Sequence, residues 1–253
     1  MTRRKRLALG ASLAFGGLLG VYGGWHVWTA PEWRTASREP VGLAPDPATV
    51  TEAVVQVYAA RAWGWRGYFG VHSWVAVKPS GAPAFTVYEV IGWRLRWNRT
   101  ALTIHERPAD ARWFGREPEL LVDLRGKGVD DVIARLDRAA RAYPYAGRYR
   151  IWPGPNSNTF TAFLGRAVPE LELDLPPTAI GKDFVEGASV STSPGGGLQA
   201  SLYGLAGIVA GPAEGLEVSV LGLVFGAHVW PPAIKLPIIG RIGWSRSEPR
   251  SLS

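Results

Sequence analysis

A run without any charged side chain, Leu7 to Val27, directly follows four basic residues at positions 3–6. A helix of that length matches the thickness of a bilayer core. Basic residues that precede such a run stay on the cytoplasmic side, which places the rest of the chain across the membrane. The sequence therefore predicts that residues 1–29 are an inner-membrane anchor and that the following domain lies in the periplasm.

A cleaved signal peptide is the alternative, because a basic start followed by an apolar run is also the signal-peptide pattern. The run is long for a signal peptide and lacks a clear A-x-A cleavage site. Trp25 and Trp28 lie at its far end, where amphipathic rings favour the membrane interface. These features favour an uncleaved anchor that crosses the membrane once.

The composition narrows the chemistry of the remaining chain. Hydrophobic residues make up 47% and charged residues 19% of the 253 residues, which is typical of a folded protein. Four of the charges behind the net +7 lie at positions 3–6, and no basic stripe appears elsewhere, so nucleic acid is not an expected partner. The absence of cysteine excludes disulfides and a thiol nucleophile. No H-E-x-x-H, G-x-S-x-G or P-loop motif is present, and we expect no metal and no cofactor.

Residues 30–49 carry four prolines and are predicted to be a linker. Residues 50–185 are predicted to form an α+β core, a largely antiparallel sheet packed on few helices. Strand-like runs at 53–63, 70–79, 84–95 and 101–108 precede a helical pattern at 128–144, and a short strand at 148–152 precedes a second helix from Asn156 to about Gly165. The turn "PSGAP" joins the second and third runs as a hairpin.

Residues 186–253 are predicted to be a β-rich segment that closes the same domain. "LEVSVLGLVFGAHVW" and "AIKLPIIGRIGW" are interpreted as two apolar strands, and neither is long enough to be a second membrane span. The alternative is that these strands lie on the bilayer surface. The sequence does not specify an oligomeric state.

The stretch "WPGPNSNTF" marks the start of the second helix of the core. Pro155 and the run Asn156-Ser157-Asn158 suit a helix N-terminus, where Asn and Ser side chains accept hydrogen bonds from free backbone amides. A cap explains the motif without any chemistry. Alternatively, Ser157 shares a helix face with Phe160 and points towards the sheet as a nucleophile, in the positive field of the helix end. Asn156 or Asn158 would then act as the oxyanion or substrate donor.

A serine nucleophile needs a base that a third group orients. His72, in "VHSWVAV", is the best candidate base, and the following hairpin brings Glu89 back opposite or diagonal to it. His72, Glu89 and Ser157 are therefore the candidate catalytic residues. A histidine packed in a sheet is the simpler interpretation of His72.

Four blocks, "VYAARAWGWRGYFGVHSWVAVKP", "YEVIGWR", "YPYAGRYRIWPGPNSNTFTAFL" and "LDLPPTAIGKDF", resemble the bacterial domain-of-unknown-function family 3750 over roughly Val54 to Phe184. That resemblance implies no particular activity.

A more distant similarity links the chain to circularly permuted papain-like hydrolases and acyltransferases. Those enzymes place a histidine on an early strand, then a polar residue, then a cysteine that opens a helix in an "N-C-x-x-F" block. The block Asn156 to Phe160 is similar, with Ser157 at the cysteine position, while His72 and Glu89 match the two earlier residues. The similarity implies a permuted papain-like fold.

Two functions follow. The first is a membrane-anchored envelope hydrolase or acyltransferase that acts on an amide or ester bond in the cell wall or in lipid, with serine as its nucleophile. The second is a non-catalytic envelope or membrane-surface binding protein with a degenerate papain-like groove.

Overall fold

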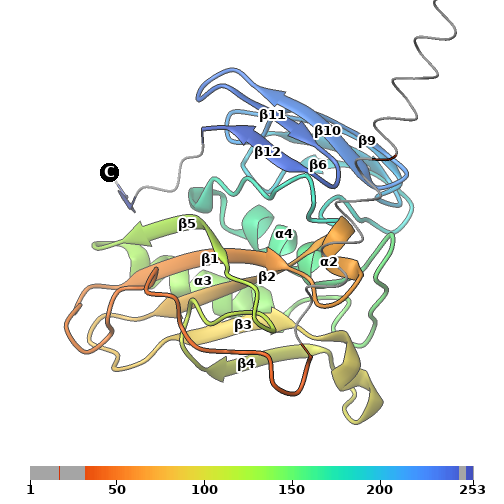
Figure 1. Cartoon of the computed structure of the whole chain (residues 1–253). Helices are drawn as coiled ribbons and strands as arrows, with labels where there is room; N and C mark the ends of the chain where they lie inside the picture. Colours follow the sequence, from red (N-terminus) through yellow and green to blue (C-terminus); the bar gives the residue numbers. More distant parts are fainter. Residues whose placement is uncertain (1–16, 18–31, 245–248, 253) are drawn as a thin grey trace, which may run out of the picture.

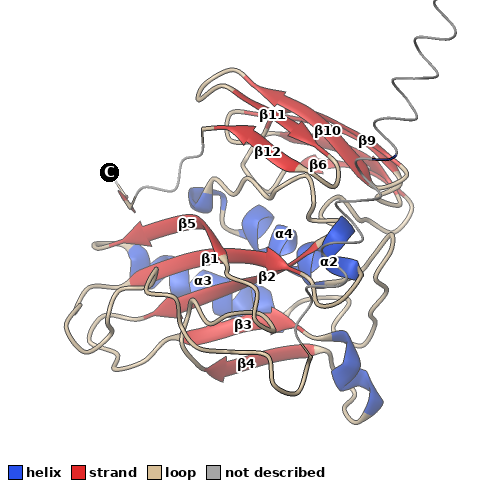
Figure 2. Ribbon diagram, viewed as in Figure 1, coloured by secondary structure: helices blue, strands red, loops and turns tan. Residues whose placement is uncertain are grey.

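The computed structural model describes residue 17, residues 32–244 and residues 249–252. Two sheets lie one above the other, and α4 lies between them (Figures 1 and 2). Most strand pairs are antiparallel, and the helices are few and short, as the sequence predicts. Within the described residues, no helix has both the length and the apolar character needed to cross a membrane. The predicted anchor lies outside the described residues, apart from Gly17.

The first sheet has the strand order β13-β5-β1-β2-β3-β4. Its strands are β1 (Val54–Arg61), β2 (Val71–Lys78), β3 (Thr86–Val90), β4 (Leu102–Glu106), β5 (Glu119–Arg125) and β13 (Arg250–Ser251). The C-terminal strand β13 returns from the second sheet to pair in parallel with β5. The predicted hairpin is present, because β2 and β3 pair antiparallel with Val75 opposite Tyr88.

Helices α3 (Val129–Arg141) and α4 (Ser157–Ala167) cover one face of this sheet. The apolar stripe of α3, which includes Val132 and Leu136, packs against Val55 and Val57 of β1 in one hydrophobic cluster. Acidic residues in the first turn of α3 and arginines in its last turn suit the helix dipole. The short helices are α2 (Arg66–Phe69) and the 3-10 segments η1 (Gly92–Arg96) and η2 (Pro169–Leu171).

The opposite face of the first sheet has its own core. Tyr58, Trp74 and Val87 point to this side and pack with Trp113 and Phe114 of the connection between β4 and β5. The linker after residue 32 also lies on this face, where the Asp110 carboxylate accepts hydrogen bonds from backbone amides at residues 41, 43 and 44. Both faces of the first sheet are therefore buried.

The second sheet is an antiparallel meander with the order β12-β11-β10-β9-β8-β7-β6. Its strands are β6 (Ala188–Thr192), β7 (Leu198–Leu202), β8 (Ala206–Gly211), β9 (Gly215–Val220), β10 (Leu223–His228), β11 (Ala233–Leu236) and β12 (Gly240–Gly243). Each of the two predicted C-terminal strands is in fact a hairpin, with turns near Gly222 and Ile238, both at positive φ. The strand predicted at 148–152 is not a strand but an irregular connection between α3 and α4.

Candidate functional site

The start of α4 is held by a capping box in which Asn156, rather than Ser157, is the cap. The Asn156 side-chain oxygen accepts hydrogen bonds from the amides of Asn158 and Thr159, and Thr159 Oγ1 accepts one from the Asn156 amide. Asn156 Nδ2 donates to the carbonyls of Ile151 and Ile180, at 3.0 and 2.9 Å. Its polar atoms are therefore committed to the backbone.

Ser157 is the first residue of α4, and its side chain is buried. It forms a side-chain hydrogen bond with Tyr149. Burial raises the pKa of Tyr149 above its ordinary value, and the hydrogen bond with Ser157 opposes that shift. Neither partner is an ionised base at neutral pH, so this contact does not activate the Ser157 hydroxyl.

Asn158 is equally committed. Its Nδ2 donates to the carbonyls of Val71 and Ile180, and its Oδ1 accepts a hydrogen bond from Ser73 Oγ at 2.9 Å. Ser73 Oγ also lies 2.9 Å from Thr161 Oγ1. This polar contact fixes α4 on β2, and it leaves Asn158 without a free donor for an oxyanion.

His72 and Glu89 form the contact that the hairpin predicts. His72 Nε2 donates to Glu89 Oε2 at 2.9 Å, and both side chains are buried. Glu89 is shared, because His105 Nε2 donates to its other oxygen at 3.0 Å and Arg107 Nε lies at 3.4 Å. Burial favours the neutral acid, but these hydrogen bonds and the Arg107 charge outweigh it and hold the pKa of Glu89 below its usual range.

The ring of His72 is covered by aromatic side chains. It stacks on Trp113, with centroids 3.7 Å apart, and on Trp74, with centroids 5.8 Å apart. Burial lowers the pKa of His72, although the contact with Glu89 opposes the shift. His72 is therefore a neutral histidine inside an aromatic core.

The first sheet separates Ser157 from His72. Successive side chains on a strand point to opposite faces. Ser73 contacts Asn158 and Thr161 of α4, so His72 points to the other face, where it packs against Trp113. Among the residues that the structure describes, no hydrogen bond or ion pair joins Ser157 to His72. The expectation that these two side chains meet is wrong, and the reason is the face of the sheet that α4 covers.

The sequence interpretation missed His105, Arg107 and Ser73 as neighbours of the candidate residues. The β3–β4 register places His105 opposite Val87. His105 is therefore diagonal to Glu89, and the two side chains lie on the same face of the sheet. The alternation of side chains along the predicted strand at 101–108 could have shown that His105 faces the same side as Glu89. Ser73 follows His72 directly, so the same alternation places it on the α4 side.

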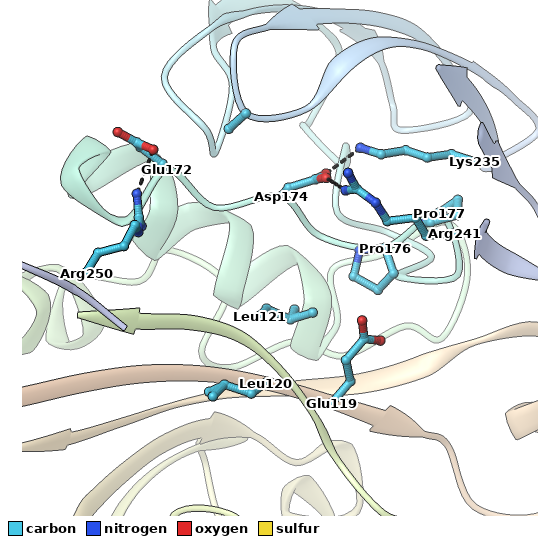
Figure 3. Close-up of a pocket in the computed structure, with 11 residues that line it drawn as sticks. Glu119, Leu120, Leu121, Glu172, Asp174, Pro176, Pro177, Lys235, Arg241 and Arg250 are labelled. Atoms are coloured by element: carbon cyan, nitrogen blue, oxygen red, sulfur yellow. Dashed lines mark hydrogen bonds and ion pairs between the residues drawn. The ribbon is translucent and has the colours of Figure 1, made fainter. Parts of the chain in front are cut away.

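A small cavity of about 50 Å³ lies between the two sheets (Figure 3). Lys235 and Arg241 both pair there with Asp174, and Arg250 pairs with Glu172. The cavity has little room for a substrate and contains none of the candidate catalytic residues. Within the described part of the chain, no group of three or more His, Cys, Asp or Glu side chains is placed to hold a metal ion.

The second sheet is a further candidate site, because its apolar side chains point outwards. They form what we name the outward apolar face, and each is between 42% and 79% exposed: Val190, Leu198, Leu202, Ile208, Leu216, Val218, Val220, Phe225, Ile234 and Ile242. Cross-strand pairing aligns Ile208 with Val218 and Val218 with Phe225 at its centre. Large contiguous apolar surfaces of this kind mark interaction sites.

Most inward positions of the same sheet are polar, with Val209, Val224 and Ala233 as the apolar ones. Ser219 Oγ donates to Asp183 Oδ2 at 2.8 Å, and Ser201 Oγ donates to the Asp183 carbonyl at 2.6 Å. Glu217 lies between Lys182 and Lys235 and pairs with both. Burial favours the neutral amine of Lys182, but the charges of Asp183 and Glu217 raise its pKa. The usual arrangement of a half-exposed sheet, apolar inside and polar outside, is therefore reversed.

Comparison with known proteins gives one match. A family model described as "Protein of unknown function (DUF3750)" matches residues 52–184, which span β1 to β5 of the first sheet, α3, α4 and the loop that follows. No curated protein and no solved structure matches the chain. The second sheet lies beyond the matched residues. The match covers more than half of the chain, which therefore belongs to the DUF3750 family of proteins of unknown function.

Proposed function

We propose that this protein is a non-catalytic membrane-surface protein whose second sheet lies with its outward apolar face on a lipid bilayer. The observation that carries the proposal is the reversed sheet. Its exposed side chains are apolar, while Glu217 and Lys235 are buried beneath it and pair with each other. A protein surrounded by water on that side would gain nothing from this arrangement.

The outward apolar face also lacks charge, since Arg241 of β12 pairs with Asp174 at the cavity between the sheets. Between Gly187 and Gly240 the charged residues are Glu214, Glu217 and Lys235, and each is only 1% exposed. Monomeric soluble proteins rarely expose a contiguous apolar patch of such extent. A hydrocarbon or headgroup boundary accepts an uncharged apolar surface readily, whereas protein partners usually meet a rim of polar and charged side chains.

Aromatic residues lie at both ends of the strands. Trp230 and Trp244 are exposed at one end of the sheet, beside the turn between β10 and β11. Trp152 and Tyr203 are exposed at the other end, where Trp152 Nε1 donates to the Leu221 carbonyl at 3.0 Å. Trp and Tyr prefer the level of the lipid headgroups. They suit a sheet that lies flat on a membrane with its two ends at the interface.

The predicted anchor at residues 1–29 agrees with this location, since it would hold the domain beside an inner membrane. The periplasmic side and the single crossing remain part of the proposal. A permuted papain-like arrangement also belongs to it, in a degenerate form. The resemblance places catalytic groups at the start of α4 and on β2, where Ser73 instead forms structural hydrogen bonds with Asn158 and Thr161.

The geometry does not favour the alternative of a serine hydrolase or acyltransferase. That mechanism requires a base within hydrogen-bonding reach of the nucleophile. Ser157 has Tyr149 as its side-chain partner, and His72 is held by Glu89 and stacked on Trp113 on the other face of the sheet.

Flotation with lipid vesicles tests the proposal. Both hydrophobic clusters lie within residues 36–252, so a chain that begins at Glu32 keeps both cores without the predicted anchor. We expect this shortened chain to float with phosphatidylcholine vesicles and to remain folded by circular dichroism. A folded chain that stays in the aqueous fraction would contradict the proposal. Light scattering without lipid tests the competing occupant: a stable dimer that the Ile208→Ser change dissociates would show that a second copy covers the outward apolar face.

A further inference from the structure

Trp152 bonds to one end of the second sheet, and a group of arginines lies in the segments next to this end. We propose that Arg148 and Arg150, supported by Arg66, bind the phosphates of anionic lipid headgroups when the outward apolar face is seated on the bilayer. This inference rests on the proposed function and adds the class of lipid that the surface selects. The residues concerned come from the irregular connection between α3 and α4 and from α2.

Contacts place the two arginines of the connection at the end of the sheet. Trp152, two residues after Arg150, is bonded to the β9–β10 turn through the Leu221 carbonyl. Arg148 pairs with Glu186 at 3.1 Å, and Glu186 lies immediately before Gly187, whose carbonyl accepts the amide hydrogen of Tyr203 in the β7–β8 turn. Figure 1 shows this connection running along the side of the molecule up to the second sheet.

Arg66 approaches the same place from α2. Its guanidinium lies 5.0 Å from the ring centroid of Trp65, and the backbone of α2 is held by Arg61 Nη1, which donates to the carbonyls of Gly67 and Tyr68 at 3.4 Å. At the end of β1, Arg61 Nη2 donates to the carbonyls of Ile238 and Ile239 in the β11–β12 turn. The start of α2 is thereby held close to the same end of the sheet.

The local charge is positive. Arg66, Arg148 and Arg150 contribute three positive charges, and Glu186 contributes one negative charge, which leaves +2. The hydrogen bond from Arg148, together with the charges of Arg148 and Arg150, lowers the pKa of Glu186, so this carboxylate stays ionised at neutral pH. Arg148 and Arg150 are exposed. Guanidinium groups bind phosphate through paired hydrogen bonds, and their position beside Trp152 is the level of the headgroups.

The test uses the full-length chain reconstituted in vesicles of phosphatidylcholine, alone or mixed with phosphatidylglycerol. The protein has no cysteine, so a single Leu202→Cys change at this end of the sheet carries an environment-sensitive fluorophore. Quenching by nitroxide-labelled lipid then reports the fraction of sheets that are seated. A Val218→Ser background weakens seating and keeps that fraction in a measurable range.

We expect phosphatidylglycerol to raise the seating constant of the parent protein. Arg150→Gln should lower it about fivefold in the anionic vesicles and leave it unchanged in the neutral vesicles, since each arginine near an anionic surface contributes about a fivefold factor. Arg150→Lys should retain most of the effect. Glu186→Gln should raise the constant about fivefold, because it removes a negative charge without adding an apolar contact. If the substitutions acted by disturbing the fold, both Arg150→Gln and Glu186→Gln would lower the seating constant.

Arg38→Gln is the matched control, because Arg38 stands over Phe114 on the side of the first sheet that faces away from α4. It should change nothing in either vesicle. Equal seating in neutral and anionic vesicles, or variants at Arg150 and Glu186 without opposite effects, would overturn the inference and leave the proposed function intact. A label that no vesicle quenches would overturn both.

Discussion

Three adjacent side chains at the centre of the outward apolar face provide a quantitative prediction. Ile208, Val218 and Phe225 lie opposite one another on β8, β9 and β10 and are 54%, 42% and 46% exposed. Burial of a whole apolar side chain of this size contributes roughly 1.5–3 kcal/mol. About half of each side chain is available to the membrane, so each contributes about 1 kcal/mol to binding.

Replacement of all three by serine should therefore cost about 3 kcal/mol of membrane affinity, or roughly a hundredfold in the vesicle partition constant. Folding should change little, because exposed substitutions typically shift stability by about 0.5 kcal/mol or less each. The assay is vesicle flotation of the chain that begins at Glu32, alongside thermal unfolding of the same protein in solution. The reversed sheet thus predicts a large loss of membrane affinity with little loss of folding stability.

Trp97→Ser is the control for this experiment. Trp97 is 75% exposed and follows η1, at the edge of the first sheet rather than on the second. Its loss should leave the partition constant within about twofold of the parent. The reasoning is refuted if the triple variant partitions like the parent, or if Trp97→Ser weakens binding as much as the triple variant does.

Three further predictions concern the family domain. The free energy of unfolding should fall as the pH drops below about 6.5, because His72 takes up a proton in the unfolded chain but resists protonation when it is buried. It should fall further below about 4.3, because Glu89 is then protonated only in the unfolded chain. Urea titrations should show that Glu89→Gln flattens the second decline, and an unchanged slope would exclude Glu89 as its source. Asn156→Ala should cost about 2–3 kcal/mol by urea unfolding, since it removes the cap and the hydrogen bonds to the carbonyls of Ile151 and Ile180, of which Ile180 keeps a second donor in Asn158. Ser157→Ala should cost about 1 kcal/mol, and the reverse order would contradict the capping assignment. A fluorophosphonate probe should not label the native protein, and labelling that Ser157→Ala abolishes would restore the enzyme hypothesis.

Elements with a clear periodicity could be predicted from the sequence. The apolar spacing of Val132, Ile133 and Leu136 gives α3, and the Pro-Asn-Ser-Asn run gives the start of α4. Hairpin geometry also gives the contact between His72 and Glu89, because the turn fixes the register of β2 and β3.

The face of the sheet that α4 covers could not be predicted in the same way. Val71 and Val75 point to one side of β2, and Trp74 and Ala76 point to the other. Both sides are apolar because both are buried, so the pattern does not say which one carries the helix. The pairing of Ser157 with His72 depended on that choice.

The second sheet was underestimated for a different reason. Strands β6 to β8 are built largely from Ser, Ala and Gly, which have little hydrophobic contrast, and the intervening "STSPGGG" resembles a low-complexity turn. Where contrast exists, as in Leu216-Glu217-Val218-Ser219-Val220, alternation does predict a strand. The same alternation shows that one face is apolar, but only the packed structure shows that this face is the exposed one.

The central claim is that the outward apolar face meets lipid in the intact protein, and the depth of a single label tests it most directly. The full-length chain with Ile208→Cys, labelled and reconstituted in vesicles, should show fluorescence that is shifted to the blue and quenched by nitroxides near the acyl chains. The same label at Trp97 should remain quenched only by water-soluble reagents. A label at position 208 that behaves like the one at position 97 would contradict the account.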